Sequence, residues 1–347
     1  MEKERLDFLL VSHLPNVRYL CGFTGSAGAL LVGANGATFF SDGRYKEQAR
    51  KEVKAARIII QRTQPLASAA LWLRDHHRSR CVIGIEGEYL TLAARGRLAS
   101  LLPARIRLKQ AAPLVERARM IKDPEEIAVL QEAVTLGSSL FGTVLDRVRP
   151  GVRETEVAAA MEFKARQAGA EGMSFETIIA SGPRSALPHG RASQAPIPRS
   201  GFVVCDFGVI LAGYCSDMTR TVYVGRLTGE ARKFYRAVQE AQQAALEAVR
   251  PGIEVGEVDH AARKVLKKAG MGRYFTHSTG HGVGLEIHEA PRVAFGQKEL
   301  LLPGMVITLE PGAYVPNKWG VRIEDMVAVT PRGASVLTST PKELVSL

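Results

Sequence analysis

The segment Val148–Val152 reads Val-Arg-Pro-Gly-Val, and about 101 residues later the segment Val249–Ile253 reads Val-Arg-Pro-Gly-Ile. In both places a Glu-Val pair follows, then a predicted helix that ends near Gly169 or Gly270, then a loop with an aromatic residue and a histidine. Two predicted strands complete each copy. Because the order of the elements repeats together with the motif, the sequence predicts a duplicated domain with an internal pseudo-two-fold repeat.

The part of the chain before the duplication alternates short apolar runs with helical stretches. Strands are expected at residues 29–32, 37–40, 57–60 and 81–85, and helices at residues 44–53 and 68–77. This pattern predicts a small α/β domain over residues 1–112, followed by an α+β domain over residues 113–347. The second domain is expected to open with a helix that is capped by Asp123, has Pro124 in its first position and Glu126 where a capping box closes, and runs to about Arg149.

The distribution of charge bears on possible partners. Residues 1–122 carry 21 Lys and Arg against 10 Asp and Glu, and residues 123–347 carry 25 of each, so the net charge of +11 lies entirely in the first third. A basic-surface nucleic-acid-binding module is therefore one alternative. We disfavour it because the basic residues are scattered and no motif that reads nucleic acid accompanies them.

Cysteine usage and apolar runs bear on the compartment. The four cysteines form no C-x-x-C pair and no evident disulfide framework, and the apolar run near Met1 is about six residues long. Such a run is too short for a signal peptide or a membrane span. The sequence therefore predicts a cytoplasmic protein that does not associate with membranes.

Four acidic residues lie in the predicted strands of the two copies. Asp206 and Asp217 come from the first copy, and Glu310 and Glu324 from the second. A tight hairpin centred on Leu211-Ala212 would put the two aspartates directly opposite each other. Ala212-Gly213 is better turn chemistry, so a bulge could shift this register. Any single acid is more often part of a structural ion pair than a metal ligand, but four that converge on a symmetry axis need cations.

Histidines accompany the acids. His281 is flanked by Gly280 and Gly282, where the backbone can approach closely. Four carboxylates and one imidazole suit two divalent metal ions about 3.5–4 Å apart. Three further histidines, His189, His277 and His288, lie in the repeated loops. A lone histidine is more often structural than catalytic, but three that cluster around a candidate metal site favour a functional role.

At these motifs the sequence resembles the pita-bread metallopeptidase family, in its aminopeptidase P and prolidase (Xaa-Pro dipeptidase) branch. The resemblance extends over nearly the whole chain. In the first domain it rests on Asn16–Ser26 and Asp42–Tyr45, and in the second on the acid, histidine and Glu-Pro-Gly motifs. It implies an α/β N-terminal domain of the creatinase type, an α+β pita-bread catalytic domain, and a homodimer.

The resemblance also implies roles for individual residues. Five match the family's metal ligands: Asp206, Asp217, His281, Glu310 and Glu324. Of these, Asp217 and Glu324 match the ligands that bridge both metals. Four more match residues of the substrate site: His189, His277, His288 and Arg322.

The expected reaction is hydrolysis of the N-terminal Xaa-Pro bond of dipeptides or short peptides. A hydroxide that bridges two divalent metal ions is a nucleophile near neutral pH. His288 is the leading candidate to stabilise the oxyanion, and Glu310 is the expected proton shuttle. Manganese is the expected metal, with cobalt, zinc or iron as alternatives, because carboxylate-rich sites accept several metals.

Two questions of specificity follow. A methionine aminopeptidase-like exopeptidase would share the fold and the ligands, but His277, Arg322 and the preceding α/β domain favour the proline-specific branch. The choice between dipeptidase and aminopeptidase stays open. A strict dipeptidase must bind the free carboxylate beside proline, and Arg184, Arg191 and Arg322 are the candidates in the sequence.

Overall fold

The computed structural model describes residues 1–347, and the chain divides into two units, Met1–Arg119 and Met120–Leu347. Helix α5, Leu114–Met120, spans this division, and the predicted domain boundary at residue 112 lies just before it.

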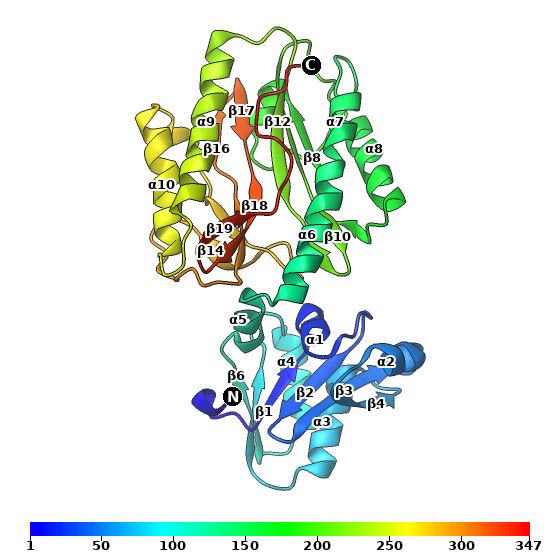
Figure 1. The fold of residues 1–347 in the computed structure, drawn as a ribbon. Helices are drawn as coiled ribbons and strands as arrows, with labels where there is room; N and C mark the ends of the chain where they lie inside the picture. Colours follow the sequence, from blue (N-terminus) through cyan, green and yellow to red (C-terminus); the bar gives the residue numbers. More distant parts are fainter. The chain divides into compact units, whose positions relative to one another are not determined.

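The first unit is built on one six-stranded sheet with the strand order β4-β3-β2-β1-β5-β6 (Figure 1). Strand β2 pairs antiparallel with both neighbours, and the remaining pairs are parallel. The strands are β1 Phe8–Val11, β2 Ala29–Gly33, β3 Gly36–Asp42, β4 Ala56–Gln61, β5 Cys81–Ile85 and β6 Ile106–Gln110. The other helices are α1 Leu14–Cys21, α2 Lys46–Glu52, α3 Pro65–His76 and α4 Leu92–Leu101.

The α/β class predicted for this unit is confirmed, and the four predicted strands and two predicted helices correspond to β2, β3, β4, β5, α2 and α3. Two strands and two further helices were missed. Strand β6 alternates Ile106 and Leu108 with basic residues, so its apolar content is low. Helix α4 has its only buried residue at Leu98, which leaves almost no periodic apolar face to detect.

The second unit opens with the predicted capping box. The Asp123 carboxylate accepts from the Glu126 amide at 2.8 Å, and the Glu126 carboxylate accepts from the Asp123 amide at 2.9 Å. The prediction of one helix to Arg149 was wrong in detail, because the chain forms α6, Pro124–Ser139, and α7, Phe141–Arg147. At the break, the Leu140 amide donates to the carbonyls of residues 137 and 138 in a tightened last turn.

The stretch Pro124–Arg147 is long and apolar enough, by length and composition alone, to cross a membrane. Core helices pass the same test, and Leu130 and Val134 of this stretch lie fully buried or nearly so in a core of the second unit. The stretch is therefore weak evidence for a membrane span.

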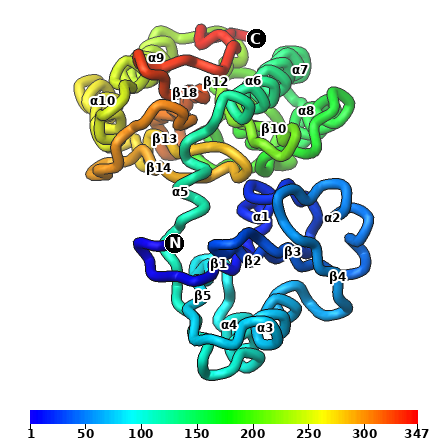
Figure 2. Tube along the Cα trace, turned by 60° about the horizontal axis from the view of Figure 1, so that its bottom comes forward, coloured from blue at the N-terminus to red at the C-terminus, as the bar shows by residue number.

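The duplication shows in matched elements. Helix α8, Glu154–Gln167, and helix α10, Val255–Lys268, each follow a Pro-Gly turn. Gly151 and Gly252 take positive φ angles of 87° and 81°, and their amides donate to the carbonyls of Ile197 and Leu301 at 2.9 and 2.8 Å. Helix α9, Gly229–Ala248, packs beside α10, as Figures 1 and 2 show.

The strands of the two copies form separate sheets. The first copy gives the order β12-β9-β8 with the small sheet β11-β10-β7, and the second gives β14-β13-β15-β18-β19 with the pair β16-β17. The first-copy strands are β7 Gly172–Met173, β8 Ile178–Ser181, β9 Gly201–Phe207, β10 Val209–Leu211, β11 Tyr214–Cys215 and β12 Met218–Val224. The second-copy strands are β13 Gly280–Gly282, β14 Glu289–Val293, β15 Val306–Leu309, β16 Gly312–Val315, β17 Trp319–Arg322, β18 Asp325–Thr330 and β19 Gly333–Val336.

Candidate active site

The two aspartates of the first copy share one face of a hairpin, but they are not directly opposite. Asp206, in β9, pairs with Thr219 of β12, and Asp217 lies two residues before Thr219. The turn falls at Ala212-Gly213, where both residues take positive φ angles of 47° and 80°. The register centred on residues 211 and 212 was therefore wrong, because two left-handed residues in succession build the favoured hairpin turn one position later.

The two glutamates of the second copy lie at strand ends. Glu310 follows β15, and Glu324 lies between β17 and β18. The Glu324 amide donates to the Thr219 carbonyl at 3.1 Å, and the Thr219 hydroxyl donates to the Glu324 carboxylate at 2.7 Å. Thr219 thus ties the acid of one copy to the strand of the other.

His281 occupies the middle of β13, between Gly280 and Gly282. Both positions require glycine because the backbone of a neighbouring segment lies too close for a side chain. A Cβ at Gly280 would lie 1.9 Å from the Thr308 carbonyl oxygen, and one at Gly282 would lie 2.1 Å from the Ala290 carbonyl oxygen. The Nδ1 atom of His281 lies 3.0 Å from the Gly282 carbonyl oxygen, which can only accept. The hydrogen is therefore on Nδ1, and the lone pair of Nε2 is free for a ligand.

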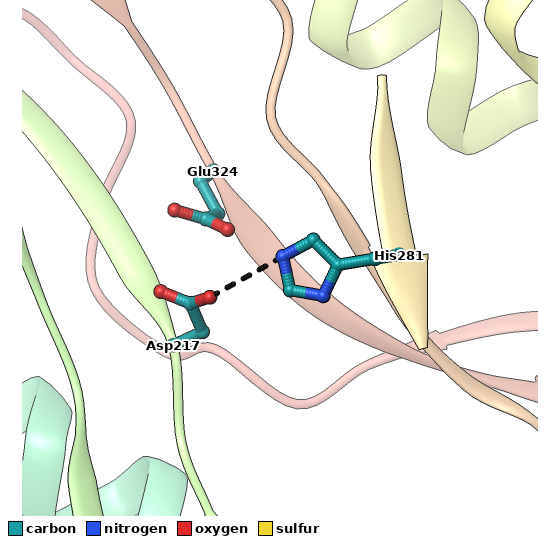
Figure 3. Close-up of side chains that lie close together, drawn as sticks. All are labelled: Asp217, His281 and Glu324. Atoms are coloured by element: carbon teal, nitrogen blue, oxygen red, sulfur yellow. Dashed lines mark ion pairs between the residues drawn. The ribbon is translucent and has the colours of Figure 1, made fainter. Parts of the chain in front are cut away.

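Figure 3 shows the imidazole of His281 and the carboxylates of Asp217 and Glu324 converging from three separate elements. Their ligand atoms all lie within 4.8 Å of one another. His281 Nε2 is 3.7 Å from an Asp217 oxygen and 3.6 Å from a Glu310 oxygen. This spacing leaves room for a cation between the groups.

All nine predicted site residues line one cavity of about 820 Å³ in the second unit. They are Asp206, Asp217, His281, Glu310, Glu324, His189, His277, His288 and Arg322. Phe175, Ile178 and Ile287 add apolar surface to the lining of this cavity.

The buried carboxylates of the cavity would be stabilised in their ionised form by a nearby cation. Burial, more than any neighbour, raises the pKa of Glu310 to about 8, and it holds the pKa values of Asp217 and Glu324 well above their usual range, with nearby carboxylates adding to the effect. Asp206 and Asp217 each keep one buried oxygen without a hydrogen-bond partner. Burial also lowers the pKa of His281 to about 4, which keeps the imidazole neutral. Oxygen-rich ligands with one neutral imidazole fit divalent cations.

Arg322 is the one guanidinium buried at the cavity, and all of its nitrogens are used. Its Nη2 donates to Asp206, Nε donates to Thr219 Oγ1 at 3.1 Å, and Nη1 donates to the Pro188 carbonyl at 3.0 Å and to the Tyr314 hydroxyl at 2.6 Å. Sequence reasoning missed Tyr314. Strand alternation from Glu310 through residue 312 to residue 314 was the signal that could have found it.

The three other histidines lie at the cavity as predicted. His277 Nε2 lies 3.0 Å from the Tyr314 hydroxyl, and burial lowers the pKa of His277 to about 3. The His288 ring meets the His281 ring edge-on at 4.4 Å between centroids, and burial lowers the pKa of His288 too. His189 lines the wall beside Arg191.

The arginines that could bind a substrate carboxylate differ in whether they line the cavity. Arg184 is bonded to the buried carboxylate of Glu154 and does not line the cavity. Arg191 lines the cavity and pairs with Glu176 at 2.7 Å. Arg292, on β14, also lines the cavity and was missed from sequence.

A duplicated α+β unit whose paired acids and neutral histidine line one cavity is the arrangement expected of a metallohydrolase. The chain belongs to metallopeptidase family M24, which residues 128–331 match, and residues 1–121 match the creatinase/prolidase N-terminal domain. The predicted family and two-part fold are confirmed.

The chain is similar to several proteins over its whole length. It is 37% identical to a Xaa-Pro dipeptidase of Pyrococcus furiosus over 99% of this chain and 97% of the relative. The solved structure of a Xaa-Pro dipeptidase from Bacillus anthracis is 40% identical with a TM-score of 0.95, covering 100% of this chain and 96% of that one. An X-Pro aminopeptidase from Thermotoga maritima is 33% identical with a TM-score of 0.91, covering 99% and 98%.

Proposed function

We propose that this metallopeptidase hydrolyses the bond between an N-terminal residue and a following proline. The observation that carries the proposal is the single cavity in which four carboxylates, four histidines and Arg322 meet. Support comes from similar proteins named for Xaa-Pro cleavage. Neither the methionine aminopeptidase-like alternative nor the nucleic-acid-binding alternative is supported by these matches.

The proposed metal ligands are Asp206, Asp217, His281, Glu310 and Glu324, with Asp217 and Glu324 shared between two ions. The buried carboxylate oxygens without partners and the free Nε2 of His281 support this assignment. Two divalent cations would supply a nucleophilic water near neutral pH and would polarise the substrate carbonyl. Manganese is the metal we propose, with cobalt, zinc or iron as alternatives, and restoring each metal to stripped protein decides among them.

The surrounding residues have separate proposed roles. Glu310 takes the proton of the attacking water and delivers it to the nitrogen of the leaving proline. His288 donates to the oxyanion of the tetrahedral intermediate, and His189 and His277 contact the substrate beside it. Arg322 holds Asp206 and Tyr314 in place through its hydrogen bonds.

Selection of proline must rely on shape, because the scissile tertiary amide has no N–H to recognise. The apolar lining residues Phe175, Ile178 and Ile287 support the proposal of a pocket for the pyrrolidine ring. For the free carboxylate of a dipeptide, Arg191 and Arg292 are the arginines with access to the cavity. Dipeptides and short peptides therefore both remain proposed substrates.

The test compares four peptides under one metal condition: Ala-Pro, Ala-Pro-Ala, acetyl-Ala-Pro-Ala and Met-Ala-Ser. We expect cleavage of the first two and little of the others, because acetylation removes the amino charge that the acidic site attracts. A rate ratio between Ala-Pro and Ala-Pro-Ala decides dipeptidase against aminopeptidase. Faster hydrolysis of Met-Ala-Ser would contradict the proposed specificity, and undiminished cleavage of the acetylated peptide would contradict exopeptidase action.

The homodimer and the cytoplasmic location stay predictions. Four buried free cysteines are compatible with a reducing compartment. Sedimentation of the purified chain tests the dimer.

A further inference from the structure

Helix α10 carries a carboxylate that takes no part in the cavity. Asp259 is fully buried, and its two oxygens accept four hydrogen bonds. The Thr279 hydroxyl donates at 2.8 Å and the Thr279 amide at 3.2 Å, while Arg263 donates from Nε at 2.6 Å and from Nη2 at 3.1 Å. A buried carboxylate with this many donors is held in one orientation.

Arg263 lies one helical turn after Asp259 and extends from the helix to the segment Phe275–Thr279. Its Nη1 donates to the Phe275 carbonyl at 3.1 Å, and its Nη2 donates to the His277 carbonyl. The guanidinium also lies over the Phe275 ring, 4.2 Å from its centroid. Together, Asp259 and Arg263 fix the beginning, the middle and the end of this five-residue segment.

The segment determines where the His277 ring points. His277 Nδ1 is 2.8 Å from the Ser278 carbonyl oxygen, which can only accept, so Nε2 accepts from the Tyr314 hydroxyl. The Tyr314 oxygen in turn accepts from Arg322. The donor direction therefore runs from Arg322 through Tyr314 to His277.

The same segment touches a proposed metal ligand. The Glu310 amide donates to the Thr279 carbonyl at 2.7 Å, so the backbone of Glu310 is anchored on the residue that Asp259 holds. A shift of the segment would move a histidine and a glutamate of the cavity together.

The first copy contains a comparable arrangement on α8. The fully buried Glu154 accepts from the hydroxyls of Ser181 and Ser193 at 2.8 and 2.7 Å and from Arg184 at 3.0 Å. These residues bracket the loop that carries His189. Each half of the duplicated unit thus pairs a buried carboxylate with a partly exposed arginine that bonds to the loop carrying a histidine of the cavity.

We propose that Asp259 and Arg263 are positioning residues for peptide hydrolysis, which hold His277 against Tyr314 and Arg322. The inference rests on the proposed function, because it takes His277 as a residue of the substrate site. A purely stabilising ion pair on α10 would not need contacts with the carbonyls of Phe275 and His277.

The test substitutes Arg263→Gln and uses Arg236→Gln as the matched control. Arg236 pairs with Glu240 at the same i,i+4 spacing on the neighbouring helix α9, but both side chains are largely exposed, at 77% and 63%. Arg263→Lys keeps the charge beside Asp259 without the second nitrogen for the His277 carbonyl, and it replaces the glutamine variant if that variant does not fold.

Two readouts are needed. Amide hydrogen exchange should speed up in Phe275–Thr279 of the Arg263 variant while the control matches the parent protein. Hydrolysis of Ala-Pro should fall by about tenfold to a hundredfold in kcat/KM, since small misplacements of catalytic groups cost that much. In a His277→Ala background, the same substitution should cost less than it does in the parent protein, because the part of the loss that acts through His277 is already gone and only the part that acts through Glu310 remains.

An equal loss of kcat/KM with and without His277, or unchanged exchange in the segment, would overturn the proposal. If the parent protein does not cleave Ala-Pro, or if His277→Ala alone has no effect, the proposed function of the site fails instead. The exchange measurement still decides in that case whether the pair holds the segment.

Discussion

Substitution of Gly280 by alanine tests how the fold places His281. Gly280 and Gly282 bracket His281 on β13, and β13 packs directly against β15. The added methyl group of Gly280→Ala would lie 1.9 Å from the Thr308 carbonyl oxygen, a backbone atom that cannot rotate away.

The magnitude follows from that contact. Real Cβ atoms essentially never approach closer than 3.0 Å, so the two strands must separate locally by at least about 1.1 Å, the difference from 1.9 Å. Overpacking of this kind costs about 1–3 kcal/mol of folding free energy. The His281 amide, which donates to Thr308 Oγ1 at 3.1 Å, moves with the strand, so the imidazole leaves its place beside Asp217. A displacement of about 1 Å costs on the order of 10²-fold in rate.

The assay combines thermal unfolding of metal-stripped protein, metal content by elemental analysis, and hydrolysis of Ala-Pro. Gly142→Ala is the control, because nothing lies within 4 Å of its added Cβ and Gly142 is inside α7, where alanine is neutral or stabilising. We expect Gly280→Ala to lose stability, metal and turnover together. If Gly280→Ala has the metal content and turnover of the parent protein, the close packing of β13 against β15 is not what positions His281.

Three further outcomes are expected. Asp217→Ala or Glu324→Ala should abolish Ala-Pro hydrolysis and lower bound metal below two ions per chain, and full metal content with normal turnover would contradict a shared dinuclear site. His288→Ala should keep near-normal metal by elemental analysis while turnover falls about 10²-fold, whereas metal loss would make His288 a ligand. Metal-stripped protein should lose thermal stability as pH rises from about 7 to about 8. In this window the unfolded histidines have already lost their protons, whereas the folded pKa of Glu310 is raised to about 8, so the folded state binds more protons than the unfolded state. Stability of the stripped protein that rises with pH in this window would contradict that ionisation.

The parts of the fold that could be predicted are those where local chemistry and periodicity agree. The capping box at Asp123 and Glu126 involves neighbours in sequence, so the motif alone predicts it. The hairpin register could not be settled, because it depended on which pair of residues would take positive φ, and Ala212 is a rare choice for that conformation. The break at Leu140 follows Gly137, Ser138 and Ser139, which are weaker helix formers than the residues before them, so this signal was present in the sequence and was not used.

The cavity was predictable to the extent that its residues carry distinctive chemistry. Asp217 and Glu324 stood out because acids on apolar strands need cations, and His281 stood out because glycines flank it on both sides. Tyr314 and Arg292 did not stand out, because a tyrosine or an arginine in a strand is ordinary, and only the tertiary pairing of β16 with β17 and of β13 with β14 brings them to the cavity. Asp259 and Arg263 were missed for the same reason, since an i,i+4 pair on a helix is usually a surface feature.

The two copies supply similar acids but not similar partners, and this asymmetry gives the cavity its chemistry. The two copies can be aligned through their acids. In the first copy Ile178 of β8 pairs with Asp206, and in the second copy Thr279 accepts a hydrogen bond from the Glu310 amide, so Thr279 corresponds to Ile178. Two residues after Thr279 lies His281, and two residues after Ile178 lies Ala180, so the first copy has an alanine where the second has the histidine. Likewise, Arg322 stands two residues before Glu324, where the first copy has Cys215 two residues before Asp217. Duplication therefore accounts for the four carboxylates around one axis, whereas the imidazole and the guanidinium that make the set selective belong to the second copy alone.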